Sequence, residues 1–130
     1  MPKRHNVAGN SPWEARVGYS RAVRIGSHVW VAGTTASDDA GRIVGPGDAE
    51  AQARQALENI RQALGQVGAG PEDVVRTRMY VTRMQDQQAV GRVHAEFFGP
   101  VRPAATMVEV SALADPAMLV EIEVEAFVDR

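Results

Sequence analysis

One stretch, DAEAQARQALENIRQALGQV at residues 48–67, decides the fold class. Asp48 is a residue type that caps helix N-termini. Apolar residues recur at three- and four-residue steps along one stripe, namely Ala53, Leu57, Ile60, Leu64 and Val67. Polar residues form the other face, namely Gln52, Arg54, Gln55, Glu58, Arg61 and Gln62. The period predicts an amphipathic helix, ended by the glycines and proline of residues 68–71.

Short β runs lie on both sides of this helix. Residues 22–25 and 29–33 surround Gly26-Ser27, which is a hairpin signal. Residues 74–84 predict a strand with two alternating faces, which are Val75, Thr77, Met79 and Val81 on one side and Arg76, Arg78, Tyr80 and Thr82 on the other.

A second helix and two more strands complete the chain. The helix begins at Asp86 or Gln87 and ends at Phe98, with an apolar side made of Val90, Val93, His94, Phe97 and Phe98. Strands are predicted at about 103–110 and 119–128. In the last strand, Val120, Ile122, Val124, Ala126 and Val128 alternate with Glu121, Glu123, Glu125 and Phe127.

The element order β-β-α-β-α-β-β predicts one α+β domain over residues 1–130, with a mixed sheet and both helices on one face. Residues 1–18 are rich in Gly, Pro and Asn and predict an N-terminal arm or loop. The sheet face without helices mixes arginines, glutamates, a tyrosine and apolar residues. Such a face favours packing between subunits.

Composition narrows the function classes. The formal net charge of −2 and the pI of about 5.9 argue against a nucleic-acid partner, since phosphate binding needs a basic surface. The absence of cysteine excludes disulfides, thiolate zinc sites and cysteine nucleophiles. His5, His28 and His94 lack metal-ligand spacing, so no metal site is predicted. No signal peptide or membrane-spanning run is recognisable, so we expect a cytoplasmic protein without a membrane partner.

Short motifs follow one another along nearly the whole chain, namely Val17-Gly18-Tyr19-Ser20, Val31-Ala32-Gly33, AQARQALENI at 51–60, Asp73-Val74-Val75-Arg76-Thr77, Phe97-Phe98, Arg102-Pro103-Ala104, Val108-Glu109-Val110 and Val120-Glu121-Ile122-Glu123. In their order and spacing they resemble the RidA family, also called YjgF/YER057c/UK114. This resemblance implies a chorismate-mutase-like α+β fold and a homotrimer with its sheets inside, its helices outside and small-molecule clefts between subunits.

Typical RidA proteins are reactive-intermediate deaminases. They are hydrolases that convert enamines and imines released by pyridoxal-phosphate enzymes into a carbonyl product and ammonia, without a metal or cofactor. The resemblance therefore implies a cofactor-free hydrolase with a small-molecule ligand in each cleft.

Matching positions define the expected site. The resemblance places Tyr19, Gly33 and Thr34 in the cleft, makes Glu121 the catalytic residue that positions water, and gives Thr106 and Met107 backbone N–H groups on the cleft strand. Two positions depart from the family. Ala105 stands where typical members have an arginine that grips the substrate carboxylate, and Gly91 stands where an asparagine is usual. Since a methyl group cannot bind an anion as a guanidinium does, we expect an atypical substrate or another anchor.

Three functional hypotheses remain open. The first is hydrolysis of a reactive imine, enamine or related metabolite. The second is a non-catalytic trimer that binds a metabolite or a partner through the same clefts. Ribonuclease activity, sometimes attached to this family, is least favoured by the acidic pI.

Several residues have a structural reading beside the functional one. Tyr19 could anchor a loop, Glu121 could be one of three glutamates on a solvated strand face, and Gly33 could serve the backbone alone. Trp13 could close the cleft as a lid or anchor the arm, and His94 could pack the second helix or border the cleft. Arg102 is expected to pair at a subunit edge. Arg76 and Arg78 are expected to meet Glu123 and Glu125 inside an oligomer.

Overall fold

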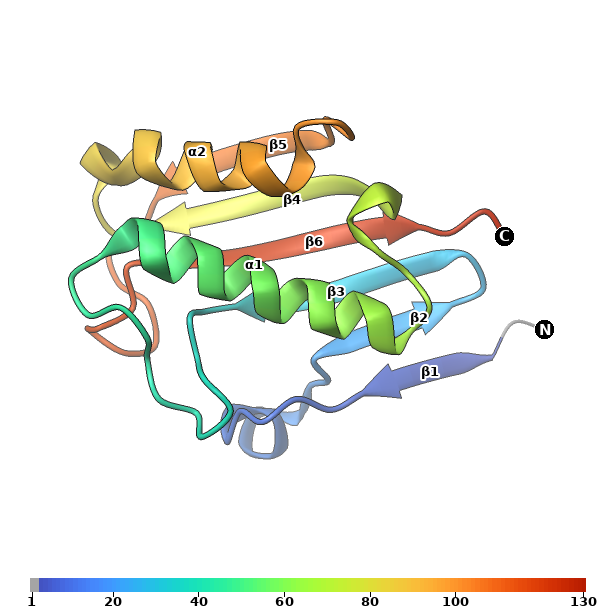
Figure 1. Ribbon diagram of the computed structural model, residues 1–130. Coiled ribbons are helices and arrows are strands. Elements are labelled where there is room, and N and C mark those ends of the chain that lie inside the picture. The colour runs from blue at the N-terminus through green and yellow to red at the C-terminus, as the bar shows by residue number, and fades with distance from the viewer. Residues whose placement is uncertain (1–2) are drawn as a thin grey trace.

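In the computed structural model, which describes residues 3–130, one mixed sheet carries two α-helices on the same face (Figure 1). The strands are β1 (Arg4–Val7), β2 (Ala22–Ile25), β3 (His28–Thr34), β4 (Val74–Val81), β5 (Ala104–Glu109) and β6 (Val120–Phe127). The α-helices are α1 (Ala49–Gln66) and α2 (Gln87–Phe98). Short helical turns are η1 (Glu14–Gly18), η2 (Pro71–Asp73) and η3 (Met84–Asp86).

The strand order across the sheet is β1-β2-β3-β6-β4-β5. The β4–β5 pair is parallel, because α2 carries the chain back across the sheet, and the other pairs are antiparallel. In Figure 1, α1 lies across β3 and β6 while α2 lies beside β4 and β5. The predicted mixed sheet with both helices on one face is confirmed.

The N-terminal segment corrects the prediction of an arm or loop over residues 1–18. Arg4–Val7 forms β1, which pairs antiparallel with β2, and Glu14–Gly18 forms a single helical turn. Val7 is buried against the core, so pairing and burial together make a strand from a sequence with little β-propensity. The sheet therefore has six strands rather than five. Residues 1 and 2 of the predicted arm lie outside the described part.

Helix α1 buries the predicted stripe of Ala53, Leu57, Ile60, Leu64 and Val67 against the sheet. Asp48 caps its N-terminus, because its side chain accepts a hydrogen bond from Ala51 N. Gln52 was predicted on the polar face and is instead fully buried. Two loops far apart in the sequence enclose its amide and satisfy it, so a residue type typical of surfaces lies in the interior.

Strand β4 follows the predicted alternation except at Val75. Thr77, Met79 and Val81 are buried, whereas Val75 is 51% exposed. The register with β6 shifts between Val74 and Arg76, which marks a β-bulge that turns Val75 away from the core.

The face opposite the helices carries charged pairs within one chain. Arg78 pairs with Glu125 at 2.8 Å across neighbouring strands, and Tyr80 donates a hydrogen bond to Glu123. The expected meeting of Arg78 with Glu125 is confirmed within one chain, Arg76 joins none of the ion pairs among residues 3–130, and the burial of this face in an oligomer stays a prediction. Exposed Trp30 and Phe127 lie on the same face. No helix within residues 3–130 combines the length and apolar composition needed to cross a membrane.

Candidate functional site

A cavity of about 700 Å³ opens where β3 ends and β6 begins. Its walls come from residues 8–19, from the segment after β3, from the C-terminal half of α1 and from the loop before β6. Tyr19, Gly33, Thr34 and Glu121, four of the residues that the sequence singled out, all line it. They come from a loop and two neighbouring strands, so the fold brings together positions about a hundred residues apart.

Glu121 and Gly33 both line the cavity, and the Glu121 carboxylate lies directly over Gly33. Strand β3 bulges here, because Val31 pairs with Val124 while Thr34 pairs with Ile122, which leaves one extra residue on β3. The carboxylate of Glu121 occupies the space that a Cβ at position 33 would fill. Gly33 therefore makes room for this carboxylate, which supplies a physical reason for a glycine at the end of the strand.

Burial raises the pKa of the Glu121 carboxyl above its usual range. The positive charge of Arg21 opposes this rise in pKa, and the negative charge of Glu123 adds to it. A carboxyl group whose pKa is raised toward neutrality exchanges protons more readily at physiological pH than an ordinary glutamate does. Glu121 thus has the environment of a candidate acid–base group.

Arg21 is the cavity residue that the sequence reasoning missed. Its Nη1 donates a hydrogen bond to Thr34 Oγ1 at 2.7 Å, and its guanidinium carbon lies 5.9 Å from the centre of the Tyr19 ring. Strand alternation could have found it, because Ala22 faces the core and the preceding residue must face the other way.

The N-terminal segment forms one wall of the cavity. Both oxygens of the buried Glu14 carboxylate share the single Gly9 N–H in a bifurcated hydrogen bond, at 2.9 and 3.1 Å from Gly9 N, which fixes the loop between β1 and η1. Trp13 lines the cavity and stays 41% exposed, with the Arg16 guanidinium 5.9 Å from its ring centre. This position is compatible with both readings of Trp13, as a lid over the cavity and as an anchor of the N-terminal segment.

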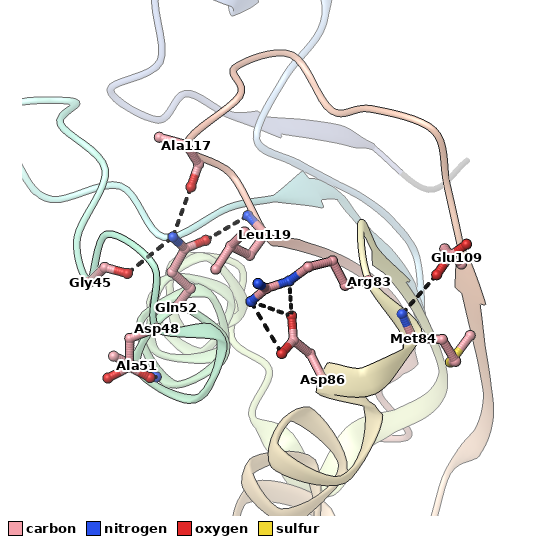
Figure 2. A network of polar contacts seen from close by, with 10 residues as sticks. All are labelled: Gly45, Asp48, Ala51, Gln52, Arg83, Met84, Asp86, Glu109, Ala117 and Leu119. Atoms are coloured by element: carbon pink, nitrogen blue, oxygen red, sulfur yellow. Dashed lines mark hydrogen bonds and ion pairs between the residues drawn. The ribbon is translucent and has the colours of Figure 1, made fainter.

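Two polar side chains of α1 hold the loops around the cavity. Asn59 donates hydrogen bonds to Thr35 O and Ser37 O, at 3.1 and 2.9 Å. Figure 2 shows Gln52 between two other loops, where its amide nitrogen donates to Gly45 O and Ala117 O. Its amide oxygen accepts from Leu119 N at 2.8 Å. These bonds position the segments that carry Asp39 and Asp115 at the cavity mouth.

Gly91, Ala105, Thr106 and Met107 do not line this cavity. They lie on α2 and on β5, and β6 and β4 separate β5 from β3 in the sheet. Within residues 3–130 β5 pairs on one side only, and five of its six residues are exposed. One chain therefore does not bring the two halves of the expected site together.

A shallower hollow of about 420 Å³ lies beside the start of β5, between α2 and the following turn. His94 and Arg102 line it. The His94 ring nitrogen Nε2 lies 2.8 Å from Thr77 Oγ1, and burial lowers the pKa of His94 below its usual value. Arg102 adopts a positive φ of 57° in the turn before β5 and joins none of the ion pairs among residues 3–130, so its pairing at a subunit edge stays a prediction.

Among residues 3–130, no group of three or more His, Cys, Asp or Glu side chains is arranged to hold a metal ion.

Known proteins resemble this chain over almost its full length. The sequence profile of the family described as endoribonuclease L-PSP matches residues 9–128. A crystal structure from Mycobacterium tuberculosis, described as a member of the highly conserved YjgF/YER057c/UK114 family, is 53% identical with a TM-score of 0.88. The alignment covers 97% of this chain and 100% of that one.

Two curated proteins are also similar. An uncharacterized protein from Streptomyces coelicolor is 41% identical over 121 residues, which cover 93% of this chain and 90% of the relative. A RutC family protein from Pyrococcus abyssi is 36% identical over 110 residues, covering 84% of this chain and 85% of the relative.

Proposed function

This chain belongs to the endoribonuclease L-PSP family, the group of YjgF/YER057c/UK114 proteins, and from that premise we propose that it hydrolyses a small reactive imine or enamine. The carrying observation is the Glu121 carboxyl, whose pKa burial raises and which lies against Gly33 inside a cavity large enough for a metabolite. The products are a carbonyl compound and ammonia.

Glu121 supplies the proton transfers of this reaction. Water adds to the carbon of the C=N bond while the Glu121 carboxylate accepts a proton from it. The protonated carboxyl returns this proton to the nitrogen, which gives a carbinolamine. Glu121 then accepts the proton of the new hydroxyl group and passes it to the amino nitrogen as the C–N bond breaks, so ammonia leaves and the carbonyl remains. Tyr19 and Thr34 shape the cavity around the substrate.

A second copy of the chain completes the site in this proposal. The family is typically trimeric, and the exposed edge strand β5 offers backbone groups that no strand of residues 3–130 covers. Gly91, Ala105, Thr106 and Met107 of the neighbouring copy then border the cavity. Backbone N–H groups near Thr106 can stabilise charge that develops in the transition state.

Ala105 favours a second candidate, a non-catalytic trimer that binds a metabolite or protein partner. A methyl group at the usual arginine position removes a charge-assisted contact, which costs about one to two powers of ten in affinity. Ribonuclease activity has weaker support, because acidic side chains, including Asp39 and Asp115, line the cavity and repel phosphate.

The test measures ammonia and carbonyl release from imines that an amino-acid oxidase generates in situ. We expect the wild-type protein to exceed the spontaneous rate and Glu121→Gln to lose that excess. Glu125→Gln is the matched control, since Glu125 lies four positions further along β6, on the same strand face and outside the cavity. Wild-type protein at the spontaneous rate, with ligand-induced stabilisation, would support the binder instead.

Two further measurements test the proposed site, namely the activity of Ala105→Arg and the oligomeric state of the wild-type protein. Activity gained only in Ala105→Arg would indicate an intact scaffold that lacks the usual carboxylate contact. Size-exclusion chromatography with light scattering should give a trimer. A monomer would contradict any site shared between copies.

A further inference from the structure

Arg21 places a cation inside the cavity without a carboxylate partner. None of the ion pairs among residues 3–130 includes it, and its hydrogen-bonded partner is the neutral Thr34 hydroxyl at 2.7 Å. Its Nε is buried and finds no acceptor among the described residues. A buried donor without an acceptor is unfavourable, so the Arg21 guanidinium keeps unmet hydrogen-bonding capacity in this state.

The Arg21 side chain is held in place rather than free to swing. Its Cβ and Cδ lie against Gly9, close enough that a Cβ at position 9 would approach them at 3.3 and 3.4 Å. Thr34 fixes one end of the guanidinium, and its hydroxyl in turn donates to Ala32 O at 2.7 Å. The Tyr19 ring lies beside the guanidinium at 5.9 Å. An anion would therefore meet a preorganised cation.

The other charged side chains that line the cavity determine which ligand charge it prefers. Glu14 lines it but its carboxylate is occupied by the Gly9 N–H, and Glu121 lies near Arg21 without forming an ion pair. Asp39 and Asp115 are exposed at the mouth. One cation without an ion-pair partner and two exposed acids fit a ligand with one carboxylate and a neutral or cationic remainder, and they disfavour a dianion.

We propose that Arg21 is the carboxylate anchor of this cavity, and that the cavity selects small 2-imino or 2-oxo monocarboxylates over dicarboxylates. Arginine suits the task because its planar fork donates parallel charge-assisted hydrogen bonds to a carboxylate. This assignment gives the chain an anion contact on β3's side of the site, in place of the arginine missing at Ala105. Glu121, near the guanidinium, then faces the C=N or C=O group of the same ligand.

That Arg21 orients a substrate for hydrolysis rests on the proposed function, whereas its capture of carboxylates does not. Binding of the stable probe 2-oxobutyrate, followed by calorimetry, separates the two. We expect measurable binding to wild-type protein and much weaker binding of the uncharged amide, 2-oxobutanamide. Equal binding of acid and amide, or no binding of the acid, would overturn the proposal.

Two arginine variants identify the anchor. Arg21→Met should weaken 2-oxobutyrate binding about 10- to 100-fold, the loss expected for a charge-assisted contact. Arg21→Lys, which keeps the charge and loses the fork, should weaken it less. Arg42→Met is the matched control, because Arg42 lies on a cavity loop with an 80% exposed side chain. Unchanged binding in a folded Arg21→Met protein would refute the role of Arg21.

If Arg21→Met does not fold, the acid–amide comparison in wild-type protein and the Arg21→Lys affinity still decide the question. Acid preference kept in full by Arg21→Lys would point to charge alone and contradict the bidentate contact. Arg21-dependent binding without any turnover would leave the anchor standing and remove the proposed hydrolysis. Turnover that Arg21→Met does not change would remove Arg21 as the anchor and leave the proposed hydrolysis standing.

Asp39 and Asp115 allow an independent test of the preference for monocarboxylates over dicarboxylates. The dianion 2-oxoglutarate should bind more weakly than 2-oxobutyrate, and the double variant Asp39→Asn, Asp115→Asn should narrow that gap. Asparagine at 115 keeps an oxygen for the Ala117 N–H, so the loop retains its hydrogen bond. A gap that does not change in the double variant would show that the mouth acids do not set the preference.

Discussion

A Cβ atom on Gly33 would lie 2.5 Å from Glu121 Oε2 and 2.9 Å from Glu121 Cδ, so the two positions cannot both carry a side chain as they stand. Gly33 is not among the positive-φ glycines of residues 3–130, so the backbone itself accepts alanine there. The conflict that alanine at 33 would create is therefore with the Glu121 carboxylate, which would have to move. This relationship ties a strand bulge to the proposed chemistry.

Gly33→Ala should displace the Glu121 carboxylate and lower kcat/KM for imine hydrolysis about tenfold to a hundredfold, because a misplacement of about 1 Å costs that much. Steady-state kinetics measures the effect. Gly65→Ala is the control, since a Cβ there meets open space on α1 and should add about 1 kcal/mol of stability. Full turnover in Gly33→Ala would mean that the position of Glu121 is not critical.

Glu121→Gln should make the protein more stable at neutral pH. The folded state raises the pKa of this carboxyl, so the folded protein holds the proton more tightly than the unfolded chain. Stability therefore falls as pH rises from the ordinary value of 4.5 to the folded-state pKa, and stays lower above it. Glutamine does not titrate, so its advantage at pH 7.5 should be about 1 kcal/mol or less.

Urea unfolding at pH 4, 5.5 and 7.5 measures this difference, which should vanish at the lowest pH. Glu125→Gln has the opposite expectation, because it removes a half-exposed ion pair with Arg78 worth about 0–1 kcal/mol. A Glu121→Gln protein that is less stable at pH 7.5 would show that attraction from Arg21 outweighs burial.

Gln52→Met should destabilise the protein by about 2–4 kcal/mol, because it leaves Gly45 O, Ala117 O and Leu119 N without their buried partner. Methionine keeps the volume, so the loss reports hydrogen bonding rather than packing. The freed loops should also raise KM. Gln88→Met, on the exposed side of α2, is the control for both readouts.

Sequence patterns predicted the parts of the fold whose burial is periodic. The stripe from Ala53 to Val67 and the alternation of β6 depend on local spacing alone, so both were recognisable. Strand β1 was not, because Arg4–Val7 becomes a strand through pairing with β2 rather than through its own composition. Gln52 was misplaced because its partners lie in loops far along the chain.

Sequence patterns likewise indicated some residues of the candidate site and missed others. Family motifs pointed to Gly33 and Glu121, and the fold places both in one cavity. Arg21 lies outside those motifs, and its contact with Thr34 depends on the bulge in β3, which no short motif reveals. Ala105 was expected beside these residues, yet two strands, β6 and β4, separate β5 from β3, so only a second chain could bring it there.

Arg130→Ala should lower the free energy of unfolding at neutral pH, and lower it less in acid. Arg130 Nη1 donates to Asp73 Oδ1 at 2.8 Å, and Asp73 also accepts from Gly70 N at 2.9 Å. The Arg130 hydrogen bond lowers the pKa of the nearly buried Asp73 carboxyl. Its stabilisation is therefore present above the ordinary value of 3.8 and is lost as pH falls through the folded-state pKa.

Chemical denaturation of wild-type and Arg130→Ala protein between pH 2.5 and 7.5 measures that dependence. Arg42→Ala is the control, because its pair with Asp38 is largely exposed and should contribute little to stability. A loss in Arg130→Ala that stays constant with pH would assign the effect to the Arg130 hydrogen bond with Gly68 O instead. A loss that fades in acid would assign it to Asp73, which would then anchor the end of the chain beyond β6 to the turn before β4.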